Sequence, residues 1–421
     1  MTKRKELSPA ALLVGSFMVI YFISYLTRLN FNAVIAEIVS IGVMSKTDAG
    51  LVGTALFVAY GVGQLISGFL GDKIKPQLII GFGLGLTCIC NLVLPFLPSV
   101  ALYIAVWGVN GFAQAMIWPP IVKMLTEYLD GNGYSKACAK ITMSSQFSTI
   151  IIYILLVPLC IRFLDWRSAF WIPSVSAAAV LIAWYFVCRR LGKSESAKPI
   201  CEGEGKNKEA VSQSGSFART MLAAGLPLIL VAIVLQGFLR DGLTSWTPTF
   251  LTEAFGFSAD SAIALNVILP IFGMLAIHFS GVLFRRVFRN EMTFSIVFFA
   301  VSTLACVLLA FVCQSNAIVS LICIALITAL MHGINLMLIG YVPRHFGKYG
   351  KASTASGITN AFTYIGSAAS SYGFAALSDS IGWTNLVLVW CGICLLGVII
   401  VLAVTRRWSR FADEKISIGT K

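Results

Sequence analysis

Two arginines inside apolar stretches are the residues of this sequence whose chemistry most needs an explanation. Arg28 lies within the largely apolar run 10–38, and Arg240 follows the apolar run 221–234. A helix of about 20 residues already crosses the core of a bilayer, so Arg28 lies within a span rather than at its rim. A guanidinium at that depth costs about 2.5–3.5 kcal/mol, so both arginines must face a polar interior.

A guanidinium in such a place is suited to bind an anion. Its planar donor fork matches the oxygens of a phosphate or a carboxylate. Two arginines converging in a low dielectric are destabilised unless an anion or an acidic partner lies between them. Neutralisation by a buried carboxylate is the alternative, with Glu37 on the first span or Asp241, which is about 100° around the helix from Arg240. We favour an anion ligand because charges within membranes are usually functional.

Other polar residues are placed to accompany Arg28. Tyr21, Tyr25, Arg28 and Asn32 are spaced i, i+4, i+7 and i+11, which puts them on one helical face. Gln64 and Gln146 are polar residues in other apolar spans. Each is expected either to donate a hydrogen bond to a ligand or to join packed helices. Asn110, Gln114 and Trp118 share a face of the fourth span.

The composition excludes a soluble protein. The chain has 421 residues, 58% hydrophobic and 12% charged, with a mean hydropathy of +0.86. Apolar segments of spanning length recur from end to end, which indicates a multi-pass α-helical membrane protein. The sequence contains no nucleophile–base constellation, metal-ligand cluster or phosphate-cradling glycine loop, so we expect neither an enzyme nor a bound cofactor or metal.

The formal net charge of +13 orients the protein and does not indicate nucleic-acid binding. The basic residues gather in alternate loops. They are Lys3, Arg4 and Lys5, then Lys73 and Lys75, Lys136 and Lys140, Arg189, Arg190 and Lys193, Arg285, Arg286 and Arg289, Arg344, Lys348 and Lys351, and Arg406, Arg407 and Arg410. This alternation follows the positive-inside rule and predicts that both termini are cytoplasmic.

Twelve spans are predicted. They fall near 10–40, 47–70, 76–97, 99–127, 139–163, 167–189, 218–243, 258–284, 291–313, 316–342, 352–378 and 383–405. The polar stretch 191–217 is too poor in large apolar residues to order itself and is predicted to be a flexible cytoplasmic linker. It separates an N-terminal six-helix half, 1–190, from a C-terminal one, 218–405, which a cytoplasmic tail, 406–421, follows.

The two halves have the marks of a duplication. Arg240 follows Arg28 by 212 positions (240 − 28), and the glycine of the turn Ser280-Gly281 follows that of Ser67-Gly68 by 213 (281 − 68). Trp383 follows Trp166 by 217 (383 − 166). Duplicated halves predict a substrate site at their interface near the middle of the membrane, with the two arginines facing each other.

The sequence resembles the major facilitator superfamily, whose transporters have this 6+6 fold. The turn Gly68–Lys73 resembles its loop between spans two and three. A closer resemblance, over nearly the whole chain, is to the organophosphate:phosphate antiporter family. It is carried by Tyr25-Leu26-Thr27-Arg28-Leu29-Asn30-Phe31, by Gly111–Pro120 with its Trp-Pro-Pro, by Leu239–Phe250 with its Arg, Trp and Pro, and by His332–Gly340.

This resemblance implies roles for particular residues. Arg28 and Arg240 match the two arginines that bind the phosphoryl group, and Tyr21, Tyr25 and Tyr60 match pocket tyrosines. Two positions depart from the family. Gln64 stands where the second-span lysine usually is, and Gln146 stands where a fifth-span histidine can be. The pocket thus keeps two anion ligands but lacks a third cation, which leaves a carboxylate substrate as an alternative. The predicted substrate-binding set is Arg28, Arg240, Tyr21, Tyr25, Tyr60, Gln64, Gln146 and Trp118.

Four charged residues are candidates for a cytoplasmic gate. Asp72 with Lys73, and Arg285 with Arg286, are expected at the cytoplasmic ends of the two halves, where charge pairs could close the inner side. The simpler interpretation is that they only orient the protein in the membrane, and both roles are compatible.

The predicted protein is a secondary transporter that works by alternating access in the plasma membrane of a bacterium. It is expected to be a monomer in the lipid bilayer and to exchange a small phosphorylated metabolite, a sugar or glycerol phosphate, for inorganic phosphate. The alternatives are a transporter of an organic carboxylate such as a sugar acid, and a transporter-like sensor of sugar phosphates.

Overall fold

The computed structural model describes residues 9–191 and 217–413, and every regular element within them is helical. The chain divides into two compact units. Unit 1 comprises Met1–Asn207 with Lys351–Ile358, and unit 2 comprises Lys208–Gly350 with Thr359–Lys421. The predicted linker, 191–217, lies almost wholly outside the described residues. Each unit is described below by itself.

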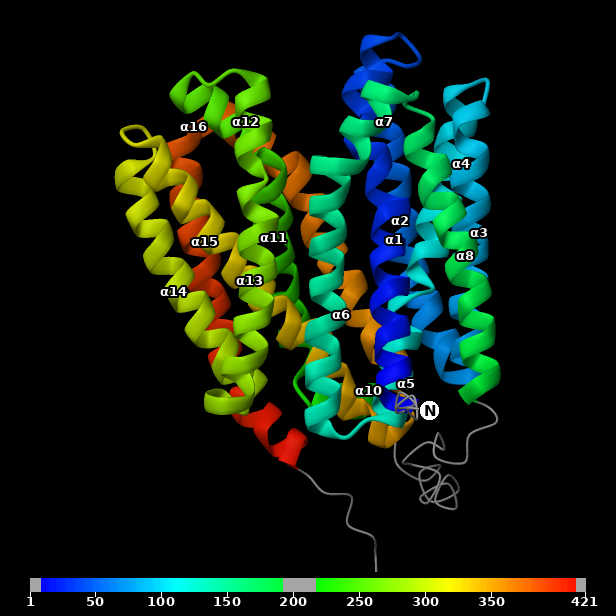
Figure 1. Cartoon of the computed structure of the whole chain (residues 1–421). Coiled ribbons are helices and arrows are strands. Elements are labelled where there is room, and N and C mark those ends of the chain that lie inside the picture. The colour runs from blue at the N-terminus through cyan, green and yellow to red at the C-terminus, as the bar shows by residue number, and fades with distance from the viewer. Residues whose placement is uncertain (1–8, 192–216, 414–421) are drawn as a thin grey trace, which may run out of the picture. The chain divides into compact units, whose positions relative to one another are not determined.

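Unit 1 is a bundle of long helices joined by short turns, coloured blue to green in Figure 1. Its helices are α1 (Pro9–Ser40), α2 (Lys46–Lys73), α3 (Pro76–Val93), α4 (Val100–Ala115), α5 (Trp118–Tyr128), α6 (Gly131–Ile151), α7 (Val157–Phe163) and α8 (Ser168–Leu191). The helix α1 packs against α6 and α8, while α2 packs against α4. A buried apolar core, which includes Trp107 between the rings of Phe31 and Phe170, lies between these helices.

Unit 2 has the same kind of architecture. Its helices are α10 (Phe217–Ala223), α11 (Leu226–Phe255), α12 (Ala259–Asn266), α13 (Ile268–Leu283), α14 (Glu291–Val312), α15 (Ala317–Asn335) and the part of α16 (Ala352–Asp413) that begins at Thr359. Both α11 and α14 pack against α15. The long α16 is two helices joined at Gly382, whose φ of 75° and ψ of 165° break the helix at the predicted boundary between the last two spans.

Eleven helical segments in the described part of the chain are long and apolar enough to cross a membrane. This confirms a multi-pass, all-helical fold. The eleventh of the twelve predicted spans, 352–378, does not meet the same criteria for apolarity, although it is helical within α16. Its many Ser, Thr and Gly residues lower its hydropathy. Small and hydroxyl-bearing residues of this kind suit a helix packed against other helices rather than against lipid.

Several predicted spans are interrupted in ways that hydropathy does not reveal. The fourth span breaks between α4 and α5 because Pro119 and Pro120 lack the N–H groups that would continue the helix. The seventh begins as α10, turns at Gly225 with a φ of 74°, and continues as α11 to Phe255, which is 12 residues beyond its predicted end at 243. Proline and left-handed glycine thus set the ends of these helices.

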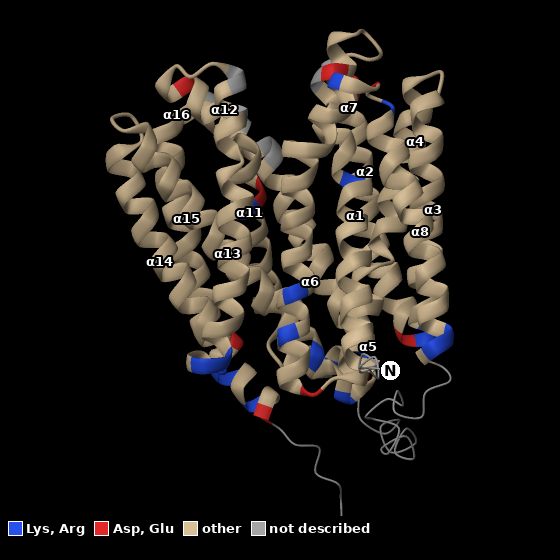
Figure 2. Cartoon of the chain, in the orientation of Figure 1, with Lys and Arg blue, Asp and Glu red and all other residues tan. Residues whose placement is uncertain are grey.

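Charge is segregated along the helices of each unit. Figure 2 shows most Lys and Arg residues of unit 1 at one end of its helices, and the same holds within unit 2. The two ends of a spanning helix face different solutions, and the end rich in Lys and Arg is the one expected in the cytoplasm. The arrangement agrees with the alternation of charge in the sequence.

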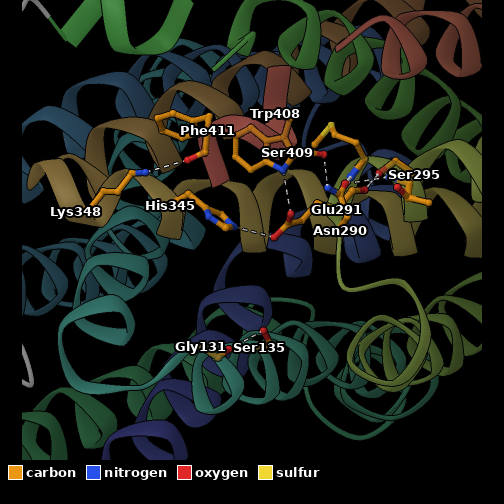
Figure 3. A network of polar contacts seen from close by, with 12 residues as sticks. Gly131, Ser135, Asn290, Glu291, Ser295, His345, Lys348, Trp408, Ser409 and Phe411 are labelled. Carbon is orange, nitrogen blue, oxygen red and sulfur yellow. Dashed lines mark hydrogen bonds and ion pairs between the residues drawn. The ribbon is translucent and has the colours of Figure 1, made fainter. Parts of the chain in front are cut away.

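A polar cluster ties together the charged end of unit 2 (Figure 3). Glu291, at the start of α14, is 2% exposed. Its carboxylate lies 3.0 Å from His345 Nε2 and accepts a 3.0 Å hydrogen bond from Trp408 Nε1. The neighbouring Asn290 donates to the hydroxyl of Ser409 at 2.9 Å. The cluster therefore holds the last turns of α16 against α14.

Candidate functional site

Arg28 of unit 1 is buried, 7% exposed, and lies among aromatic rings. Its Cζ is 4.0 Å from the centroid of the Tyr25 ring on α1 and 5.1 Å from that of Tyr60 on α2. A guanidinium over the face of a ring is attracted by about 0.5–2 kcal/mol, and more strongly where water is excluded. The rings therefore stabilise the positive charge within this apolar span.

The predicted aromatic residues of unit 1 form a chain of ring contacts that ends at Arg28. The Tyr21 ring lies 5.2 Å from that of Tyr25 and 5.1 Å from that of Trp118. Trp118 reaches this place because it is the first residue of α5, directly after the break in the fourth span. We call Tyr21, Tyr25, Tyr60 and Trp118 the aromatic cluster. Its members come from α1, α2 and α5, and two of them, Tyr25 and Tyr60, lie against Arg28.

Two polar groups near the cluster are buried without a hydrogen-bond partner in the described structure. They are the indole N–H of Trp118 and the whole side-chain amide of Gln64, which has no exposed surface. Gln64 lies one turn after Tyr60 on the same face of α2. A buried polar group without a partner costs about 1–3 kcal/mol and requires an explanation. These groups would be explained if they donate hydrogen bonds to a polar ligand or accept them from it.

Gln146 is also buried, 8% exposed, on α6, which packs against α1. This places it on a helix next to that of Arg28. Its participation in the site remains a prediction.

The backbone next to Arg28 is held by amide side chains from α3 and α4. The carbonyl of Thr27 accepts hydrogen bonds from Asn91 Nδ2 at 2.9 Å and from Asn110 Nδ2 at 3.1 Å. Gln114 Nε2 donates to the Thr27 hydroxyl at 2.8 Å. Asn30 Nδ2 donates to Asn91 Oδ1 at 2.8 Å, which closes the network. All five residues are buried.

This amide network fixes the position of α1 on both sides of Arg28. Asn110 and Gln114 were recognised in the sequence as one face of the fourth span, but Asn91 was not. The feature of the sequence that could have identified Asn91 is its position as a lone asparagine in the apolar stretch 79–94. Such residues hydrogen-bond across helices in membranes, at about 0.6 kcal/mol on average.

Replacing Asn91 by alanine is expected to weaken both the fold and anion binding. The change removes the bonds to Thr27, to Thr87 and from Asn30, at a cost of about 1–3 kcal/mol for the buried groups left without a partner. Melting of the purified protein in detergent, with and without phosphate, measures both effects. The control is Asn385→Ala, since Asn385 is exposed and bonds only to a carbonyl of its own helix. An unchanged Asn91→Ala protein would contradict the positioning role.

Arg240 of unit 2 is held by a carboxylate. Its Nε donates to Asp241 Oδ1 at 2.6 Å and its Nη2 to Asp241 Oδ2 at 2.8 Å, which is a bidentate pair. Its Nη1 donates to Asn335 Oδ1 on α15 at 2.7 Å. The neutralising carboxylate considered in the sequence is therefore present, although the two residues are about 100° apart around the helix. Asp241 is thus a carboxylate well inside a span, paired with the arginine that precedes it.

The Arg240 pair is fixed by close packing of α11 on α16. A Cβ at Gly237 would lie 2.6 Å from the Thr363 carbonyl oxygen, and one at Gly366 would lie 2.8 Å from a backbone nitrogen of α11. This close approach lets the Ser367 hydroxyl donate to Asp241.

Gln236, one turn before Arg240, is fully buried, and its amide lacks a hydrogen-bond partner in the described structure. The i, i+4 spacing from Arg240 is the feature of the sequence that could have identified Gln236 as a neighbour of the arginine.

Asp72, a predicted gating residue, caps the start of α16. Its carboxylate accepts hydrogen bonds from the backbone N–H groups of Ser353 at 3.1 Å and Thr354 at 2.9 Å, and from the Thr354 hydroxyl. The first N–H groups of a helix lack partners within the helix, and a negative charge there is favourable. Lys123 supports the same turn by donating to the Gly71 carbonyl at 2.8 Å.

The other predicted gating residues have different surroundings. Lys73 lies over the ring of Phe69, 4.0 Å from its centroid. Arg286 is exposed, and Arg285 has a buried nitrogen without a partner among the described residues. These observations leave their gating role a prediction.

Comparison with known proteins finds relatives that match nearly the whole chain. The chain is 27% identical over 407 residues to the glycerol-3-phosphate transporter of Bacillus subtilis, covering 93% of this chain and 90% of that protein. It is 23% identical to a probable hexose phosphate transport protein of Chlamydia trachomatis, covering 91% and 88%, and 24% identical to the membrane sensor protein UhpC of Escherichia coli, covering 88% and 86%. The resemblance to the organophosphate:phosphate antiporter family is thus confirmed.

Solved structures agree at the level of the fold. The proton:xylose symporter XylE matches with a TM-score of 0.74 at 12% identity, over 94% of this chain and 95% of that one. The transporter FucP in its outward conformation matches with a TM-score of 0.67 at 13% identity, over 97% of this chain and all of that one. The sequence model of the Major Facilitator Superfamily covers residues 17–371. The chain therefore belongs to the Major Facilitator Superfamily and is a multi-pass integral membrane protein.

Proposed function

We propose that this protein is a secondary transporter that exchanges a phosphorylated metabolite, a sugar or glycerol phosphate, for inorganic phosphate. The observation that carries the proposal is Arg28, which is buried within an apolar span, faced by tyrosine rings and next to Thr27, where the amide network holds the backbone. A fixed cation in a low dielectric recognises an anion strongly because it needs no reorganisation on binding. The relatives named as glycerol-3-phosphate and hexose phosphate transporters support a phosphoryl group as that anion.

The proposed working arrangement follows the superfamily. Residues 1–190 and 218–405 form two six-helix halves that move by alternating access, joined by the cytoplasmic linker 191–217 and followed by the tail 406–421. Both termini are cytoplasmic, and the protein works as a monomer in the plasma membrane of a bacterium. It carries out transport without covalent chemistry on its substrate.

The proposed substrate site consists of Arg28 and Arg240 with the aromatic cluster, Gln64 and Gln146. The arginines bind the phosphoryl oxygens, and the rings and amides shape the pocket around the rest of the substrate. Asp72, Lys73, Arg285 and Arg286 are proposed to act at the cytoplasmic gate. In support, Asp72 caps the first turn of α16, a helix whose later residues belong to unit 2.

A binding panel tests the substrate class. Purified protein in detergent is melted with inorganic phosphate, glycerol 3-phosphate, glucose 6-phosphate and glucuronate, with glycerol and glucose as uncharged controls. We expect the phosphate compounds to raise the melting temperature at concentrations about tenfold or more below those of glucuronate, because a phosphate monoester carries up to two charges near pH 7. A stronger effect of glucuronate would establish the carboxylate alternative, and no effect of any anion would overturn the site.

A sensor is the second candidate, because a relative of similar identity is the membrane sensor protein UhpC. A sensor and a transporter would bind the same ligands in the panel. They differ in flux, since a sensor binds a sugar phosphate without moving it across the membrane.

A further inference from the structure

Asp241 occupies the part of Arg240 that is best suited to bind an anion. The Nε and Nη2 atoms point in parallel and form one of the two bidentate edges of a guanidinium. Both atoms donate to Asp241, at 2.6 and 2.8 Å, while Nη1 donates to Asn335. A phosphoryl group that uses the Nε–Nη2 edge must therefore displace the carboxylate.

The pair is placed where such a displacement is feasible. The Arg240 side chain is 13% exposed and that of Asp241 is 33% exposed, so the carboxylate has access to the space outside the protein core. The Ser367 hydroxyl also donates to Asp241. Asp241 therefore keeps a hydrogen-bond donor when it releases the arginine, and that donor lowers the cost of the exchange.

We infer that Asp241 is an internal competitor for the substrate anion and sets the affinity of the Arg240 site. The inference rests on the proposed function, since it assumes that Arg240 binds substrate. When a binding-competent state is populated only in part, the apparent dissociation constant rises by the inverse of that fraction. The binding of every anion that uses this edge is weakened by the same factor. Only ligands with strong intrinsic affinity therefore bind at low concentration.

This role differs from the simpler one in which Asp241 only positions the guanidinium. A positioning carboxylate would strengthen binding, and its removal would weaken it. A competing carboxylate weakens binding, and its removal strengthens it. The two roles therefore predict changes of opposite sign in the same measurement.

The test is the affinity of Asp241→Asn and Asp241→Ser for inorganic phosphate and glycerol 3-phosphate, measured by calorimetry on purified protein. Both changes remove the negative charge, and asparagine keeps the side-chain shape and the ability to accept a bond from Ser367. If the pair forms in four-fifths of empty molecules or more, the dissociation constants should fall about fivefold or more, by a similar factor for both ligands. Asp165→Asn is the matched control, because it removes a carboxylate that is 53% exposed and pairs with Arg167 outside the proposed site, and it should stay near the wild-type affinity.

The melting temperature without ligand and the elution profile in gel filtration establish whether each variant is folded. Two neutral variants are used so that the test still stands if one of them does not fold. Weaker or unchanged binding by the folded neutral variants would overturn the inference. That outcome is separable from failure of the proposed function, in which the wild-type protein itself would bind neither phosphate compound.

Discussion

The Arg28→Lys protein is expected to lose anion exchange by about 100-fold or more while remaining folded. Lysine keeps the positive charge but not the planar fork, so the bidentate bonds to a phosphoryl group are lost. Hydrogen bonds to a charged group contribute about 1.5–3 kcal/mol each, and the loss of two amounts to a factor of this order. Uptake of labelled glycerol 3-phosphate into phosphate-loaded proteoliposomes measures the effect.

Arg167→Lys is the matched control for this change. Arg167 is also in unit 1, but its side chain is 41% exposed and pairs with Asp165. Exposed ion pairs contribute at most about 1 kcal/mol, so this variant should exchange at nearly the wild-type rate. Substantial exchange by a folded Arg28→Lys protein would show that the fork of Arg28 is not the anion ligand.

The second large effect is expected at Gly111, where α4 crosses α2 without a side chain between them. A Cβ built at this position would lie 2.9 Å from the carbonyl carbon of Leu56 and 3.0 Å from its Cα. These are backbone atoms of a packed helix, which cannot move aside singly. We expect Gly111→Ala to destabilise the protein by about 2–3 kcal/mol, the upper part of the range for overpacking. Tyr60, one turn after Leu56, would shift with α2, so binding should also weaken.

Gly108, one turn earlier on α4, provides the control. A Cβ there would lie 3.9 Å from the nearest atoms, which belong to Ala55 and are at ordinary contact distance. Gly108→Ala should therefore melt at or slightly above the wild-type temperature, because alanine favours the helix. Equal melting temperatures for the two variants would mean that the close approach of α2 and α4 does not limit stability.

The helices and one side of the site could be predicted because both leave local signals. Spans are visible as apolar runs of sufficient length, and Tyr21, Tyr25 and Arg28 share a face through their spacing alone. Tyr60 and Trp118 were placed by resemblance to the antiporter family, since no spacing rule connects α2 or α5 with α1. The approach of Tyr60 to Arg28 depends on tertiary packing, and that of Trp118 to Tyr21 depends also on the break before Pro119.

The partner of Arg240 shows what sequence alone could not decide. Asp241 was considered as a neutralising residue, but its angle around the helix argued against a direct pair. Whether adjacent side chains meet depends on rotamers and on neighbouring helices, here on Ser367 of α16 and Asn335 of α15. The amide network at Thr27 was missed for a similar reason, since Asn91 is 64 positions away from it in the chain.

Helix ends were also beyond the reach of hydropathy. Thr244, Ser245 and Thr247 follow the predicted end of the seventh span at 243, but α11 continues through them to Phe255. Thr244 and Thr247 each donate a side-chain bond to the carbonyl four residues earlier, at 2.7 and 2.6 Å. Bonds of this kind let polar side chains remain in a helix at low cost.

The most direct test of the account is counterflow with the wild-type protein. Proteoliposomes are loaded with inorganic phosphate, with sulfate or with buffer alone, and labelled glycerol 3-phosphate or glucose 6-phosphate is supplied outside. We expect rapid uptake only into phosphate-loaded vesicles, because an exchanger returns to the outer face when it carries an anion. Uptake that is independent of internal phosphate would contradict exchange, and binding without any uptake would instead identify a sensor.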